Sequence, residues 1–146
     1  MRVDFYQLGG APIEIVLASL AAKLLADDQR MLVIGEEETL LARLDRLLWD
    51  QGAASFLPHG LVGGADDVRQ PILLSTTPDT PNLARNLAIA DGVWRDAALG
   101  FDRAFYLFDA DTLEAARLAW KLLSGREGVD RHYWAQSEAG GWIEKA

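Results

Sequence analysis

The side chains that most often perform catalysis are scarce in this sequence. It contains no cysteine, which excludes disulfides, thiolate zinc sites and cysteine nucleophiles, and it contains two histidines, His59 and His132. None of its serines lies in a G-x-S-x-G motif, the sharp turn that presents a nucleophilic serine to its substrate. We therefore interpret both histidines as structural or solvent-exposed and predict no catalytic residue.

Patterns for phosphate and metal binding are also weak. The sequence has Gly9-Gly10 but no G-x-G-x-x-G, and it lacks Gly-Lys-Ser and Gly-Lys-Thr. A tight turn explains the glycine pair. Asp109-x-Asp111 and Asp66-Asp67 carry the oxygen ligands that Mg²⁺ prefers, but helix capping and loop solvation account for these aspartates. We predict no metal and no cofactor.

Two basic side chains, Arg117 and Lys121, are spaced to share one face of a predicted helix. Like charges at this spacing cost on the order of a few tenths of a kcal/mol, and an acidic ligand would relieve the repulsion. The alternative is a solvated helix edge, with Arg117 paired to Glu114 and Lys121 near the helix C-terminus, where the helix dipole favours cations. Residues 1–102 hold eight basic and fifteen acidic side chains, whereas residues 103–146 hold six and seven. The C-terminal third is therefore the region best suited to an acidic partner.

A second unusual position is Trp49. At about 100° per residue it lies roughly 140° from Leu44 around its helix, away from the apolar stripe. The apolar residues Phe56-Leu57-Pro58 follow in an irregular segment. Exposed aromatic side chains near loops are typical anchors for a partner helix or peptide. Alternatively, the connection folds back over Trp49 and completes a small satellite core.

Helices and strands must position these residues, and the hydrophobic pattern of the sequence predicts that they form an α/β domain. With 146 residues, the chain is expected to form a single domain, residues 1–146. Apolar runs alternate with segments of helical periodicity, which favours a Rossmann-like three-layer fold with a mainly parallel sheet flanked by helices. The expected strands are 3–8, 31–34, 71–76, 87–90 and 103–108, and the expected helices are 12–28, 36–49 and 112–124. Residues 51–68 are expected to be irregular. Residues 132–136 and 142–144 are expected to form a hairpin.

Composition and charge further limit the kind of protein and the partners to expect. Apolar residues are 50% and charged residues 25% of the chain, which is ordinary globular composition. The net charge of -8 disfavours sequence-independent binding to DNA and binding to an anionic membrane. No apolar run has the length of a signal peptide or a membrane span. We expect a cytoplasmic protein with no membrane contact, which meets DNA only indirectly.

Five short elements occur in order along nearly the whole chain. They are Phe5-Tyr6-x-Leu8, Leu48-Trp49 followed by Ser55-Phe56-Leu57-Pro58-His59, Pro71-Ile72-Leu73-Leu74, Asn86-Leu87, and Ala116-Arg117-x-x-Trp120-Lys121. Each is weak alone, but their order and separations make the sequence similar to the chi subunit of bacterial DNA polymerase III.

The resemblance implies a non-catalytic accessory subunit of the clamp-loader complex with a Rossmann-like fold. In that family, chi joins the psi subunit to the single-stranded DNA-binding protein, whose acidic C-terminal tail ends in hydrophobic residues. Such a tail needs a cation and an apolar pocket. Arg117, Trp120 and Lys121 match the tail-binding motif, and Tyr106 falls where an apolar contact to the tail would lie.

The resemblance also implies a second partner surface, for psi or for a helicase-like alternative. Trp49 and Phe56 match its aromatic residues, with Leu57 and Pro58 in the same element, and His59 is assigned to the turn. The hairpin from Gly125 to Ala146 is longer than in the best-known members of the family.

Two other hypotheses stay open. One is a degenerate nucleotide-binding α/β enzyme. The other is direct binding of single-stranded DNA by stacking on exposed tryptophan and tyrosine rings, which the negative net charge disfavours.

Overall fold

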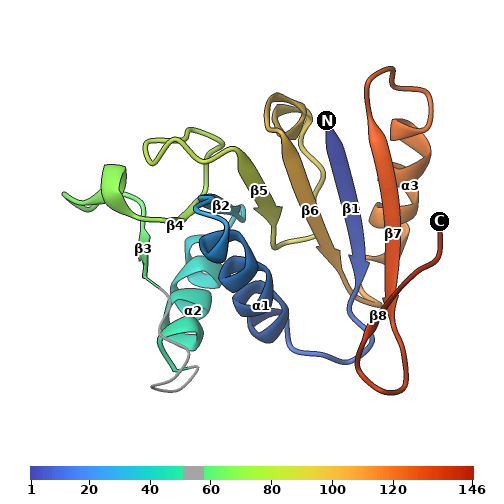
Figure 1. The fold of residues 1–146 in the computed structure, drawn as a ribbon, viewed down its shortest axis with the longest axis horizontal. Coiled ribbons are helices and arrows are strands. Elements are labelled where there is room, and N and C mark those ends of the chain that lie inside the picture. Colours follow the sequence, from blue (N-terminus) through green and yellow to red (C-terminus); the bar gives the residue numbers. More distant parts are fainter. Residues whose placement is uncertain (51–57) are drawn as a thin grey trace.

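The computed structural model describes residues 1–50 and 58–146, in which one sheet is flanked by helices on both faces (Figure 1). The described elements are β1 (Arg2–Gln7), α1 (Ile13–Ala26), β2 (Met31–Ile34), α2 (Glu38–Trp49), β3 (His59–Leu61), β4 (Ile72–Ser75), β5 (Asn86–Ile89), β6 (Arg103–Phe108), α3 (Leu113–Leu123), β7 (Asp130–Gln136) and β8 (Trp142–Glu144). Two short 3₁₀ helices, Asp67–Arg69 and Asp96–Gly100, lie in the connections.

The sheet has the strand order β3-β4-β2-β5-β6-β1-β7-β8 within the described residues. All neighbouring pairs are parallel except β7 and β8, which form an antiparallel hairpin. The predicted mainly parallel sheet and the predicted C-terminal hairpin are thus confirmed. The Rossmann-like label stays a prediction, because β5 and β6 separate β1 from β2, unlike the strand order of dinucleotide-binding folds.

The inner strands are buried on both faces, so their side chains alternate between two cores. On β1, Tyr6 belongs to the core beneath α1 and α2, whereas Val3 and Phe5 belong to the core beneath α3. The same alternation on β7 sends Trp134 toward the first core and Tyr133 toward the second. This regular alternation produces the three layers visible in Figure 1.

The helices have apolar stripes that match the core they cover. On α3 the buried residues are Ala116, Ala119 and Leu123, at helical spacing, while Leu118 and Leu122 are exposed on the outer side. None of the helices in the described ranges is long and apolar enough to cross a bilayer.

The connection before β4 is more ordered than the sequence predicts. Its described part contains β3, which pairs in parallel with β4, and the 3₁₀ helix Asp67–Arg69. A three-residue strand is too short to show an alternating pattern, so the sequence alone predicts only an irregular segment. His59 lies in β3 rather than in the turn to which it is assigned from the sequence, and it is buried with its Nε2 3.0 Å from the backbone oxygen of Asp45.

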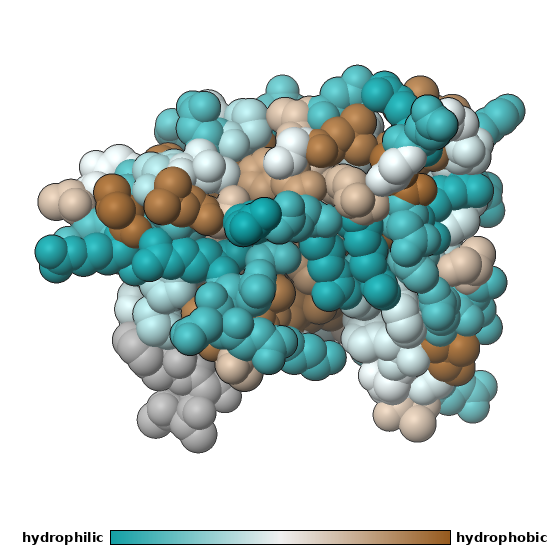
Figure 2. Space-filling view, turned by 45° about the horizontal axis from the view of Figure 1, so that its top comes forward, coloured by the Kyte–Doolittle hydropathy of each residue, from teal (hydrophilic) through white to brown (hydrophobic). Residues whose placement is uncertain are grey.

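The surface in Figure 2, which turns the top of Figure 1 toward the viewer, is dominated by polar side chains. Apolar side chains on this face occur in small, separate groups rather than in one broad patch. On this face, an apolar docking site would have to be a local feature.

Asp4 on β1 is a fully buried carboxylate with three strands around it. It accepts hydrogen bonds from Arg2 on its own strand, from the Arg103 Nε on β6 at 2.7 Å and from the Trp134 Nε1 on β7 at 2.9 Å. Burial raises the pKa of Asp4, but these hydrogen bonds outweigh burial, so the pKa lies below its ordinary value. The ionised carboxylate therefore stabilises the packing of β6, β1 and β7.

We expect Asp4→Asn to lower the free energy of unfolding by about 2 kcal/mol at pH 7, since two arginines lose their anionic partner while keeping partial access to water. Because the folded pKa of Asp4 is depressed, its contribution is complete above the ordinary pKa and is lost as the pH falls through the folded value. Urea unfolding at pH 7, 5 and 3 should show the gap between the two proteins closing only at the acidic end. A gap independent of pH would contradict this role, and Asp102→Asn, in an exposed pair with Arg85, is the control.

Candidate functional site

A pocket of about 390 Å³ lies between α3, the end of β1 and the C-terminal hairpin. Its lining is made of Gln7, Phe108, Leu113, Ala116, Arg117, Trp120, Tyr133 and Ala146. The aromatic rings come from three different elements, β6, α3 and β7, whose positions are set by the sheet order. The pocket is therefore an apolar, largely aromatic depression with one cation on its lining.

Arg117 is that cation, and its exposed guanidinium pairs with Glu114 one turn earlier on α3, with the Arg117 Nη1 to Glu114 Oε1 distance at 2.9 Å. This pair is the solvated-edge arrangement that the sequence offers as an alternative to a ligand site. An exposed i, i+3 pair is worth at most about 1 kcal/mol, so an incoming carboxylate can replace Glu114 at low cost. The pairing leaves Arg117 available to an acidic ligand.

Trp120 serves as both core and pocket wall. Its ring packs edge-on against Phe5 at 5.2 Å and against Tyr133 at 5.9 Å between centroids. The Arg131 guanidinium lies over the same ring, 4.0 Å from its centre, and also donates to the Trp120 carbonyl oxygen. The side chain is only partly buried, which leaves part of the ring on the pocket.

Tyr133 and Arg131 are functional candidates that the sequence analysis missed. Both come from β7, which the structure inserts beside β1 and against α3. Tyr133 and Arg117 line the same pocket; burial raises the pKa of Tyr133, and the positive charge of Arg117 opposes that rise. The hairpin was visible in the sequence, but its docking next to β1 was not.

Tyr106 requires a correction, because the structure places it in the core rather than at the pocket. Its side chain is fully buried beside Phe5 and Phe108, and its hydroxyl donates to the carbonyl oxygen of Gly92. Burial raises the pKa of Tyr106 to about 12. A completely covered ring cannot contact a peptide in this conformation, and the pocket position belongs to Tyr133.

Lys121 is exposed on α3, one turn beyond Arg117, and is not part of the pocket lining. The structure therefore brings together two of the four predicted tail-binding residues, Arg117 and Trp120.

The second predicted surface lies at the other end of the sheet, beside β3 (Figure 1). Trp49 ends α2 with 48% of its surface exposed, which agrees with its position off the apolar stripe. Its ring packs against His59 at 4.3 Å between centroids, and Pro58 is exposed. Phe56 and Leu57 lie outside the described residues.

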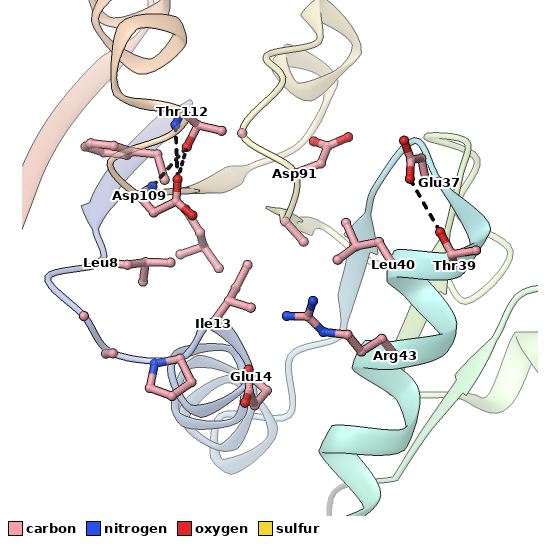
Figure 3. A pocket seen from close by; sticks show the side chains of 17 residues that line it. Leu8, Ile13, Glu14, Glu37, Thr39, Leu40, Arg43, Asp91, Asp109 and Thr112 are labelled. Atoms are coloured by element: carbon pink, nitrogen blue, oxygen red, sulfur yellow. Dashed lines mark hydrogen bonds between the residues drawn. The ribbon is translucent and has the colours of Figure 1, made fainter.

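A larger cavity, of about 810 Å³, opens where β1, β5 and β6 end near the beginnings of α1, α2 and α3. Figure 3 shows Arg43 of α2 directed into this cavity opposite Leu8 and Ile13. Strand ends of this kind are where α/β folds commonly bind nucleotides. The cavity is thus the place to examine for the nucleotide hypothesis.

The charges of this cavity are poorly suited to phosphate. Four carboxylates line it, from Glu14, Glu37, Asp91 and Asp109, against the single cation of Arg43. Asp91 already pairs with Arg95 at 2.7 Å, and the Asp109 Oδ1 accepts a hydrogen bond from the Thr112 backbone at 3.1 Å. In the part of the chain that the structure describes, no three carboxylate or imidazole groups are arranged to hold a metal ion.

Comparison with known proteins identifies the class. Residues 1–130 match the family model described as DNA polymerase III chi subunit, HolC. The chain therefore belongs to the DNA polymerase III chi subunit family.

A characterised relative also supports membership of the chi family. The chain is 28% identical over 82 residues to DNA polymerase III subunit chi of Escherichia coli (strain K12), and the alignment covers 56% of each chain. Residues 131–146, which carry Arg131 and Tyr133, lie beyond the range that the family model matches.

We expect Trp120→Ala to lower the free energy of unfolding by about 2–3 kcal/mol, less than for a fully buried tryptophan because part of the ring faces the pocket. Chemical unfolding at pH 7 measures this loss. Leu118→Ala, on the exposed side of the same helix, should stay within about 0.5 kcal/mol of wild type. Equal losses for the two variants would contradict the packing described for Trp120.

Proposed function

We propose that this chain is a non-catalytic accessory subunit of the DNA polymerase III clamp-loader complex that connects the complex to the C-terminal tail of single-stranded DNA-binding protein during replication. The observation that carries the proposal is the pocket of about 390 Å³ beside α3, called the α3 pocket from here on. In this chain of the chi family, aromatic side chains line that pocket together with Arg117.

The chemistry of the pocket fits that tail. An acidic peptide with a hydrophobic end needs apolar surface for its last side chain and a cation for its carboxylates. Trp120, Tyr133 and Leu113, which are all partly exposed, supply the apolar surface, and Arg117 supplies the cation. Lys121, although outside the lining, adds positive charge along the approach on α3.

The strength of binding follows from the exposure of these charges. Arg117 must exchange Glu114 for the ligand, and both side chains are well exposed to solvent. Exposed charge contacts are screened by salt, so we expect micromolar-scale affinity that falls as the salt concentration rises. Contact with DNA through the partner protein, rather than directly, agrees with the net charge of -8.

The opposite end of the sheet is proposed as the surface for a second partner, the psi subunit or a helicase-like protein. Trp49 is half exposed there and packs against His59, and Pro58 is exposed; Phe56 and Leu57, which belong to the same sequence element, lie outside the described residues. A large, partly exposed aromatic side chain is a common interface anchor. Because the two surfaces lie at opposite ends, one chain can hold both partners at once.

The first test is titration of a labelled peptide copied from the C-terminus of the host single-stranded DNA-binding protein. We expect saturable binding by the wild type and at least tenfold weaker binding by Arg117→Ala, because the pocket loses its cation. Isothermal calorimetry or fluorescence anisotropy at low salt gives both constants.

Two variants serve as controls for this titration. Arg85→Ala removes an exposed arginine from a similar surface pair, with Asp102, and should bind as wild type does. Glu114→Gln removes the competing carboxylate and should bind equally or up to about threefold more tightly. Absence of wild-type binding would refute the tail connection, and equal binding by Arg117→Ala would refute the site.

For the second surface, we expect Trp49→Ala to weaken binding of the purified host psi subunit at least tenfold while leaving the tail peptide unaffected. Leu118→Ala, an exposed apolar residue on the far side of the molecule, should leave psi binding unchanged. Unchanged psi binding by Trp49→Ala would remove this residue from the interface.

A further inference from the structure

Gln7, the last residue of β1, is a polar side chain on the lining of the α3 pocket. It shares the alternation of Val3 and Phe5, so it lies on the α3 side of the sheet. On the adjacent strand Tyr133 pairs with Phe5 in register, and its side chain lies on the same side of the sheet. Two polar groups from neighbouring strands therefore meet in a mostly aromatic pocket.

These two groups are joined by a hydrogen bond in which the Tyr133 hydroxyl donates to the Gln7 Oε1 at 2.5 Å. An amide has an accepting oxygen on one side and two N–H donors on the other. Once the hydroxyl of Tyr133 engages the oxygen, the Gln7 Nε2 is the side of the amide left to contact a ligand. Tyr133 is itself held by edge-on ring contacts with Trp120 and Phe108.

The hairpin keeps this arrangement in place. Backbone hydrogen bonds join the Tyr133 amide to the Ala146 oxygen at 3.0 Å and the Lys145 amide to the Tyr133 oxygen at 2.6 Å. Ala146 is part of the pocket lining. The segment after residue 130 thus supports both the tyrosine and one edge of the pocket.

We propose that Gln7 is a second recognition residue of this pocket, whose Nε2 donates to a carboxylate at the C-terminal end of an acidic, hydrophobic-ended peptide, and that Tyr133 is its positioning residue. This inference rests on the proposed function. A carboxylate accepts several hydrogen bonds, and Arg117, which shares its charge with Glu114, satisfies only part of that capacity. The uncharged amide of Gln7 adds a donor deeper in the pocket without adding another charge to desolvate.

The test is Gln7→Glu, which keeps the size of the side chain and the oxygen that Tyr133 engages but replaces the donors with a negative charge. We expect this variant to bind the tail peptide at least tenfold more weakly than wild type. Gln29→Glu makes the same change just before β2, at the amino ends of the parallel strands and away from the carboxyl end of β1 where Gln7 lies. It keeps the oxygen that accepts from the Asn86 Nδ2, so it should bind within about twofold of wild type.

A second peptide with an amidated C-terminus separates a direct contact from a structural effect. If Gln7 faces the terminal carboxylate, amidation weakens binding to the wild type, and the penalty of Gln7→Glu falls below about threefold for the amidated peptide. An equal penalty for both peptides would overturn the assignment of that carboxylate to Gln7.

Two further variants keep the proposal falsifiable if Gln7→Glu destabilises the pocket, which its melting temperature would reveal. Gln7→Met removes the donors without adding charge, and we expect three- to fivefold weaker binding of the carboxylate peptide and no change for the amidated one. Tyr133→Phe keeps the ring contacts and should weaken binding two- to fivefold, with no further loss when combined with Gln7→Met. Additive losses would show that Tyr133 does not act through Gln7.

Failure of this proposal and failure of the proposed function give different results. If the wild type does not bind the tail peptide, both fall. If Arg117→Ala weakens binding while Gln7→Glu and Gln7→Met bind as wild type does, the pocket stands and Gln7 has no part in recognition.

Discussion

The carboxylate of Asp4 lies fully buried at the place where β6, β1 and β7 run side by side, and the α3 pocket depends on how these strands are joined. An unpaired buried charge would be very costly, so its bonds to Arg2, Arg103 and Trp134 specify which strands flank β1. With β7 in that position, Tyr133 necessarily faces α3. The α3 pocket is therefore a consequence of strand order as much as of the helix that carries Arg117.

The eight-stranded sheet of the described residues also acts as a spacer. The α3 pocket is built around β1 and β7, near one end of the strand order, and Trp49 packs beside β3 at the other end. The sheet keeps the α3 pocket and Trp49 apart, so under the proposed function a partner at one end leaves the other end accessible.

The larger cavity at the strand ends lies where α/β folds commonly bind nucleotides, but its side chains do not carry the positive charge that a nucleotide site needs. Four carboxylates face one arginine there, and two of them are already engaged: Asp91 in an ion pair, and Asp109 as acceptor from the Thr112 backbone in the turn before α3. Phosphate groups would meet repulsion where nucleotide-binding folds provide backbone donors and cations. Position in a fold alone is thus weak evidence of function.

The sequence by itself determined the α/β class, the strands of the sheet core, the amphipathic helices and the exposure of Trp49, because periodicity and apolar runs are local properties of the chain. Spacing on one helix face also indicated Arg117 together with Lys121, and the resemblance to the chi family added Trp120. Only the tertiary structure decided that Tyr133, rather than Tyr106, lines the pocket, and that Gln7 meets Tyr133 there. These outcomes depend on β7 pairing with β1, a contact between residues more than 120 positions apart in the chain that no local pattern encodes.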